Sequence, residues 1–291
     1  MPPTSTVSTK QTESEALRLR LTTKLEQDEL DLPLLPVVAT QVLQLSGDPN
    51  ADATKLSTLI QQDQALAGQI LRIANSPAYA SRSPIVSLQQ AIAWLGMTIL
   101  ASLAFSVSIQ SGVFKVKGYE KEVQALWRQA LATGLYGKEI ARRNRHNVEN
   151  AFLCGILHTI GKPLLIHLIL QDRDDTSSQP SWAIMDTVIQ EFSILAGTKL
   201  AEAWQLPEPV QEAIRFYPDE AYQHATSPTK GAMITCLADH LATGIIDPSS
   251  LDEEALRAHP VVQDLNFYPE DMDALLELKD PIQQSVESFL A

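Results

Sequence analysis

The chain has 291 residues, enough for one large or two ordinary domains, and its 45% hydrophobic and 20% charged residues are normal for a globular protein. Its 22 Lys and Arg against 35 Asp and Glu give a net charge of -13, which disfavours sequence-independent binding to nucleic acid or to an anionic membrane surface. We expect other proteins or small molecules as partners.

The two cysteines, Cys154 and Cys236, both lie in apolar helical stretches. Such a thiol either reacts or binds metal, or is simply a small buried side chain in a reducing cytoplasm, and we favour the second interpretation. Met1–Thr12 is polar and lacks a signal segment, and the longest apolar run, Ile99–Ile109, is too short to cross a bilayer. We therefore expect a cytoplasmic protein with no membrane contact.

Residues 1–24 are expected to form a disordered or partly helical leader. Met1–Glu15 has little to bury and is predicted to be disordered, whereas Leu17, Leu21 and Leu25 follow at helical spacing.

Residues 25–118 carry the start and stop signals of about six short helices. Asp63 is a predicted N-cap, Ser87 and Gln90 have capping-box spacing, and Gly96 is a helix stop. Thr98–Phe114 is apolar on nearly all sides, as in the central helix of a bundle. Because no long stretch alternates with period two, the sequence predicts an all-α fold.

Asn75 ends one of these helices in the run Asn75-Ser76-Pro77. Its side chain either closes the helix end or contacts a partner or the second half of the chain. We favour the capping role, because asparagine is common in caps and turns.

Residues 119–291 repeat the helical pattern. Asn150 is a candidate cap for the first of the apolar segments, which are Ala151–Leu157, Leu164–Leu170, Trp182–Trp204, Ala232–Leu241 and Ile282–Leu290.

Four segments resemble the signature of the HDOD domain, a bacterial signalling module related to the HD and HD-GYP phosphohydrolases. They are Leu32–Pro36, Gln61–Leu66, Ile70–Ser76 and Ser87–Gly96. The resemblance implies a small N-terminal helical bundle, residues 25–118, packed on a C-terminal HD-like helical domain, residues 119–291.

The segment Gly155–Lys162 resembles the HD motif itself. His158 matches the motif histidine, but Thr159 stands where the motif has aspartate. The resemblance also places Gln129 at the position of the first ligand histidine, and it matches Asp239 to the last aspartate.

Two further blocks of the catalytic relatives also lack their histidines here. Ser193–Gly197 has no histidine before its glycine, and Phe216 and Tyr217 occupy the place of a His-His pair. Because a metal needs several converging ligands, we predict a degenerate site with no metal, no cofactor and no catalysis. His158 is then expected to be a buried histidine that bonds with Asp239, Thr159 and Gln129.

Three functions are compatible with these residues. The first is a non-catalytic signalling module that binds signalling proteins, or a nucleotide; no receiver, GGDEF or EAL-type segment follows, so its output is expected through partners in trans. The second is a metal-dependent phosphohydrolase with altered ligands, for which Asp186 and Glu191 would join His158 and Asp239. The third is a ligand sensor that holds an anion near Lys162 or Arg128.

Overall fold

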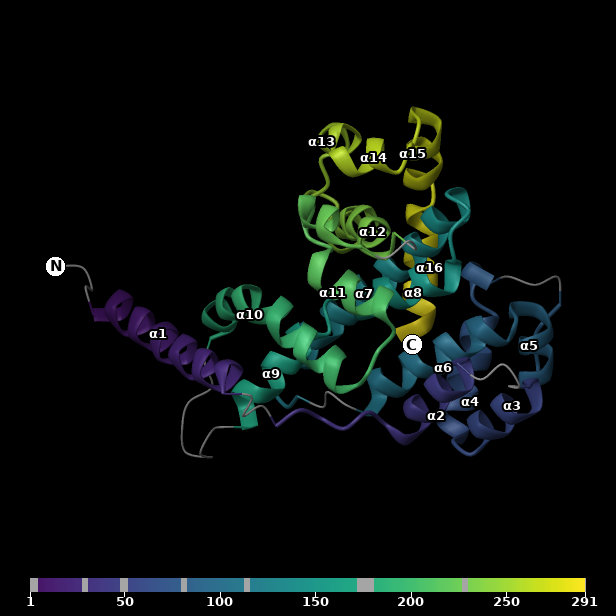
Figure 1. The fold of residues 1–291 in the computed structure, drawn as a ribbon, viewed down its shortest axis with the longest axis horizontal. Coiled ribbons are helices and arrows are strands. Elements are labelled where there is room, and N and C mark those ends of the chain that lie inside the picture. Colours follow the sequence, from purple (N-terminus) through teal and green to yellow (C-terminus); the bar gives the residue numbers. More distant parts are fainter. Residues whose placement is uncertain are drawn as a thin grey trace.

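The computed structural model describes residues 5–27, 31–47, 52–79, 83–112, 116–171, 181–226 and 230–290. Within these ranges the chain forms sixteen α-helices and two short 3-10 helices, and the described residues contain no strand. The all-α prediction is therefore confirmed (Figure 1).

The first half is a compact bundle in which α6 packs against each of the other four helices. Leu100, Leu103 and Phe105 of α6 are buried, as the apolar sequence of this helix predicted. The bundle contains α2 (Val37–Gly47), α3 (Ala53–Gln61), α4 (Gln64–Ala74), α5 (Leu88–Leu95) and α6 (Met97–Gly112), with the 3-10 helix η1 (Pro77–Tyr79) between α4 and α5.

Side-chain caps set the boundaries of these helices. Asp63 accepts the Leu66 N–H at the start of α4, and Ser87 accepts the Gln90 N–H at the start of α5, as predicted. The Asn75 amide donates to the carbonyls of Leu71 (2.7 Å) and Ile85 (2.8 Å), and its oxygen accepts the Ile85 N–H. Asn75 therefore closes α4 and ties it to the segment before α5.

The second half surrounds the long helix α7, which packs on α8 and α12. Its elements are α7 (Glu120–Arg143), α8 (Val148–Leu157), α9 (Gly161–Gln171), α10 (Trp182–Ala203), α11 (Glu208–Phe216), η2 (Asp219–His224), α12 (Gly231–Ile246), α13 (Glu253–Ala258), α14 (Pro260–Asp264), α15 (Pro269–Leu276) and α16 (Lys279–Leu290). The cap of α8 is Asn147, whose side chain accepts the Asn150 N–H, so the prediction for Asn150 is wrong by three residues.

The leader also differs from its prediction. Helix α1 (Ser5–Glu26) is continuous from Ser5, so Ser5–Glu15 is helical where disorder was expected, and the boundary at residue 25 falls inside a helix. Met1–Thr4 lies outside the described residues. Further along the same helix Leu17, Leu21 and Leu25 are buried, and α1 packs on α10, beside which it lies in Figure 1.

The C-terminal helix connects the two halves. Helix α16 packs against η1 and α4 of the first half and against α7 of the second. At this junction Tyr79 contacts Phe289, with their ring centroids 6.5 Å apart, and the Lys138 ammonium lies 3.9 Å from the centre of the Tyr79 ring. The predicted arrangement of a small bundle packed on a larger helical domain is therefore present.

One apolar stretch is longer than Ile99–Ile109, the longest apolar run predicted from the sequence. Val148–Gln171, which spans α8 and α9, has the length and hydropathy of a membrane span, and so does the sharply bent pair of α5 and the first part of α6. In the fold, 83% of the apolar window of Val148–Gln171 is buried by other parts of the protein. The apolar side chains of this stretch are therefore removed from water by packing in the protein core.

Candidate functional site: a filled HD-like centre

The glycines of Gly155–Lys162 allow two close helix contacts. A Cβ atom on Gly155 would lie 2.6 Å from Gly134 Cα, so this glycine lets α8 approach the backbone of α7. A Cβ atom on Gly161 would overlap the Ser193 carbonyl oxygen and lie 2.6 Å from Gly197 N, so this glycine lets α9 approach α10. The motif therefore joins α8 and α9 at two close helix contacts, and His158 and Thr159 lie between its two glycines.

The joint brings three predicted residues together around one carboxylate oxygen. His158 Nε2 lies 3.0 Å from Asp239 Oδ1, and the Gln129 amide donates to the same oxygen at 2.8 Å. These side chains come from α7, from the end of α8 and from α12. The predicted link between His158, Gln129 and Asp239 is present, and the His158 side chain is fully buried.

Both ring nitrogens of His158 face acceptors. Nδ1 lies 2.6 Å from the Gly155 carbonyl oxygen, and Nε2 faces Asp239. A carbonyl oxygen and an ionised carboxylate only accept, so each ring nitrogen of His158 is placed to donate a hydrogen bond when it carries a proton.

Asp239 is stabilised as an anion by its neighbours. Its burial opposes ionisation, but the charge of His158, the hydrogen bonds from His158 and Gln129 and the charge of Lys162 outweigh this and lower the pKa of Asp239 to about 2. About a fifth of its side chain is exposed, so solvent still reaches one edge of the carboxylate.

Lys162 contributes a second cation to the centre. The side chain is buried, and this burial lowers its pKa, while the charges of Asp239 and Asp186 oppose the shift. Lys162 is one of the two residues predicted to contact an anion. Asp239 and Asp186 interact with it electrostatically, and the predicted contact with a bound anion stays a prediction.

Two further side chains contribute to the centre: Thr133, which was not predicted, and Tyr217, whose contact with His158 was not predicted. The Thr133 hydroxyl donates to the Gln129 carbonyl at 2.9 Å and lies 3.4 Å from Asp239 Oδ1. Its position four residues after Gln129, on the same face of α7, was the available signal. Tyr217 was noted only as replacing a histidine, and its ring packs edge-on against His158 with centroids 4.6 Å apart.

The side chains of two other candidate residues form ion pairs with neighbouring helices. Arg128 forms an ion pair with Glu287 of α16 at 3.0 Å, and Glu191 forms one with Arg18 of α1 at 2.7 Å. Thr159 is buried and its carbonyl accepts the Lys162 N–H, whereas the ring nitrogens of His158 contact Gly155 and Asp239, so the predicted bond between His158 and Thr159 is not among these contacts.

Among the described residues, the His/Cys/Asp/Glu cluster compact enough to hold a metal is Cys236, His240 and His259, and it includes none of the ligands expected for a phosphohydrolase. Glu191 and Asp186 therefore do not complete a ligand set with His158 and Asp239 in this structure.

The fold and this centre define an all-helical protein of HD-like architecture. The family model of the HDOD domain matches residues 32–219, and the chain belongs to the HDOD domain family. The resemblance read from the sequence is confirmed, and the match includes all of α2 to α11.

An uncharacterized protein of Treponema pallidum (strain Nichols) is 26% identical over 198 residues, which are 64% of this chain and 37% of that protein. The matched region therefore spans well under half the length of this relative.

Solved structures share the fold at low identity. A candidate metal-dependent phosphohydrolase from Shewanella amazonensis SB2B aligns with a TM-score of 0.73 and 20% identity, covering 94% of this chain and 99% of that one. An HDOD domain protein with unknown function from Geobacter sulfurreducens has a TM-score of 0.68 and 19% identity, with 94% and 97% covered. A candidate signal transduction protein from Marinobacter aquaeolei VT8 has a TM-score of 0.62 and 21% identity, with 96% and 66% covered.

Proposed function

We propose that this protein is a non-catalytic regulatory module that acts in the cytoplasm by binding signalling proteins supplied by other chains. One observation carries the proposal: the carboxylate that a metal would need, Asp239, is already bonded to His158 and Gln129 and lies in the field of Lys162. In this proposal the protein donors and the charge of Lys162 stabilise the carboxylate in place of a divalent ion.

The ligand chemistry supports this proposal. A phosphohydrolase metal activates water and neutralises phosphate charge, and it needs several hard or borderline ligands around one point. Thr159 offers a hydroxyl where a carboxylate is required, and the Gln129 amide is a poor ligand.

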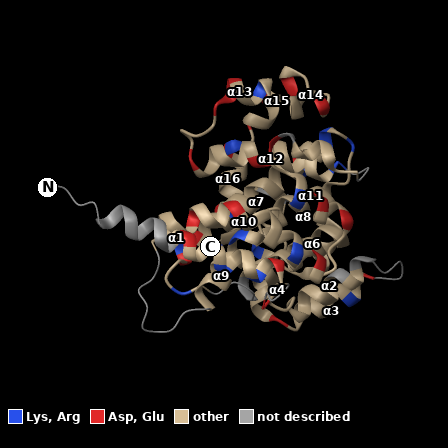
Figure 2. Ribbon diagram, turned by 60° about the vertical axis from the view of Figure 1, so that its left-hand side comes forward, with Lys and Arg blue, Asp and Glu red and all other residues tan. Residues whose placement is uncertain are grey.

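The charge distribution supports protein partners over nucleic acid or an anionic membrane. Acidic residues exceed basic residues by 13, and in Figure 2 the Lys and Arg residues are scattered among several helices. Binding to phosphate backbones requires clustered basic groups that displace counterions. The similarity of fold to a candidate signal transduction protein is consistent with a regulatory role.

The competing function is a metal-dependent phosphohydrolase, which the name of the Shewanella structure and the retained His158 and Asp239 favour. We would assay the purified full chain with Mn²⁺ or Mg²⁺ on nucleotides and cyclic dinucleotides, beside His158→Ala. The proposal expects no turnover above that of the variant. Turnover in the native chain that is lost in His158→Ala would establish the enzyme instead.

The binding half of the proposal requires its own measurement. Proteins captured from the source cell by the native chain would be identified by mass spectrometry, purified and titrated against it by calorimetry. The proposal expects saturable binding to at least one signalling protein. A thermal-shift screen with nucleotides tests the ligand-sensor alternative, which predicts a rise in melting temperature that Lys162→Met reduces.

A further inference from the structure

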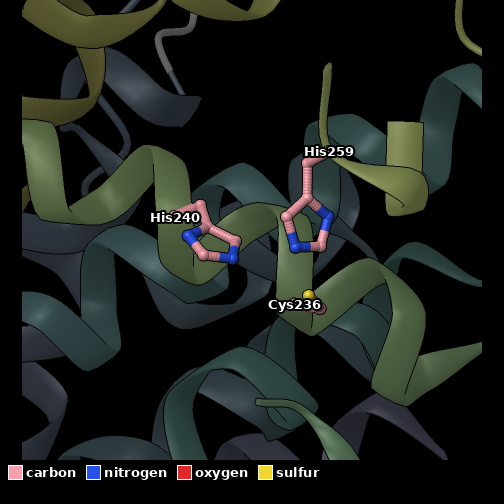
Figure 3. A group of neighbouring side chains, drawn as sticks. All are labelled: Cys236, His240 and His259. Carbon is pink, nitrogen blue, oxygen red and sulfur yellow. The ribbon is translucent and has the colours of Figure 1, made fainter. Parts of the chain in front are cut away.

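A second polar cluster lies on α12, close to Asp239 in sequence but built from different side chains. Cys236 and His240 are four residues apart on this helix, so they share one face. His259, at the N-cap of α14, joins them from the following segment. Figure 3 shows the two imidazole rings beside each other, with the Cys236 sulfur close to both.

The distances suit a single small ion. One potential ligand atom from each of the three residues lies within 4.8 Å of the others, and the centroids of the two rings are 4.9 Å apart. Cys236 is buried, whereas His240 and His259 are partly exposed, so an ion has a route to the thiol.

A candidate for the fourth ligand, an oxygen atom of Asp219, lies beside the cluster. Asp219 Oδ1 lies 3.5 Å from His240 Nε2, and the Asp219 carbonyl accepts the Cys236 S–H at 3.3 Å. The Asp219 carboxylate is 80% exposed, so it is free to turn toward the ion at little cost. One thiolate, two imidazoles and one carboxylate form a four-ligand set that suits Zn²⁺.

We infer that Cys236, His240 and His259 form a Zn²⁺ site, with Asp219 placed to supply the fourth ligand. The ion would link α12 to η2 and to the start of α14, and so would fasten the α13–α14 segment to the core. The inference is independent of the proposed function, because it uses no residue of the His158 centre.

Binding changes two protonation sites. The Cys236 thiol releases one proton to solvent when its sulfur becomes a thiolate ligand. His259 Nδ1 accepts the Val261 N–H at 3.2 Å, so Nε2 is the nitrogen that would bind the ion. Coordination through Nε2 moves the ring proton to Nδ1, so the bond from Val261 is lost and its amide becomes a reporter of metal binding.

The test is a Co²⁺ titration of the reduced, metal-free full chain, followed by displacement with Zn²⁺. We expect one ion per chain, a thiolate-to-cobalt charge-transfer band, and the visible bands of a tetrahedral ion. Cys236→Ser should abolish the charge-transfer band, and His240→Gln should weaken Zn²⁺ binding by more than the roughly 10- to 100-fold cost of losing an outer-shell partner.

The controls are Cys154→Ser, which changes the other buried thiol, and His224→Gln, which changes a histidine outside the cluster. Both should keep the bands, as should His158→Ala, which separates this site from the His158 centre. Because the His240 side chain is about one-third exposed, His240→Gln remains informative even if Cys236→Ser unfolds. Absence of stoichiometric Co²⁺, or bands that survive His240→Gln, would overturn the inference.

Discussion

Asp239 accepts hydrogen bonds from His158 and Gln129 and interacts with the charge of Lys162. The hydrogen bonds and the charges of His158 and Lys162 lower the pKa of Asp239, so the centre favours the ionised carboxylate. At the scale of single residues, Asp239 is therefore a stabilising group.

The first prediction concerns Asp239→Asn, which keeps the shape but removes the charge. The pKa of Asp239 is lowered from 3.8 to about 2, so the stability it contributes is complete above pH 3.8 and is lost as the pH falls through about 2. We expect a loss of about 2 kcal/mol at pH 7, measured by urea unfolding.

The pH dependence provides the check on this assignment. The difference between the native chain and Asp239→Asn should shrink as the pH falls below 4. Asp63→Asn is the matched control, because asparagine caps a helix about as well as aspartate does. An Asp239→Asn effect that is constant with pH would contradict the electrostatic explanation.

At the scale of elements, two glycines set how closely the helices of the centre approach. Gly155 faces Gly134 across the contact of α8 and α7, and Gly161 faces Gly197 across the contact of α9 and α10. These crossings position His158 between α7 and α12. The geometry of the centre is therefore a property of helix packing as much as of its polar residues.

The second prediction is that Gly161→Ala destabilises the fold by about 1–3 kcal/mol or more, because its Cβ would overlap the backbone of α10. Gly68→Ala on α4 is the control: nothing lies within 4 Å of its Cβ position, and alanine should stabilise that helix by about 0.5–1 kcal/mol. Thermal unfolding followed by circular dichroism measures both. Equal effects in the two variants would show that the close contact is unimportant.

The third prediction concerns the docking of α1. Leu21 is buried against the core, whereas Leu19 on the same helix is 70% exposed. Leu21→Ala should weaken the docking of α1 on α10 by about 2–5 kcal/mol, and Leu19→Ala should have little effect. Hydrogen exchange should show faster exchange of α1 amides in Leu21→Ala alone.

At the scale of the whole molecule, η1, α7 and α16 join the two halves around Tyr79. The ring lies between Lys138 and Phe289, and Lys138 is itself buried. Burial lowers the pKa of Lys138 to about 8 from its ordinary 10.5. The junction therefore holds an ammonium group whose charge is disfavoured by its surroundings.

The fourth prediction follows from this shift. Between pH 8 and 10.5 the unfolded chain binds a proton at Lys138 that the folded chain does not, so this group makes stability rise with pH, by up to about 1.4 kcal/mol per pH unit. Lys138→Met should be more stable than the native chain at pH 7, and its advantage should decrease as the pH rises above 8.

This comparison is made as a difference between the two proteins at each pH. Burial raises the pKa of Tyr136 and of Cys154, so these groups act in the opposite direction, and subtraction cancels them. Urea unfolding between pH 7 and 9.5 gives the values. A Lys138→Met advantage that does not change with pH would contradict the assignment.

Much of the helical fold, and some residues of the His158 centre, could be predicted from short-range sequence patterns. Asp63 and Ser87 start helices because their side chains bond to backbone groups three residues away, and His158 was recognised by its place in Gly155–Lys162. Asn150 was misplaced as a cap because Asn147, three residues earlier, offers the same chemistry. Thr133 was missed because its role depends on Asp239, which is 106 residues away.

By itself the sequence determined the helical composition, the family and the presence of Gln129 and Thr159 at two positions of the motif, because each depends on residue identity or on short-range spacing. The tertiary structure alone decided that the chain's own donors converge on Asp239, that α1 docks on α10, and that Cys236 and His240 meet His259. The physical reason is that periodicity specifies which face of a helix is buried. Which side chains meet across two faces depends on how closely the backbones approach, and here contacts such as Gly161 against Gly197 set that approach.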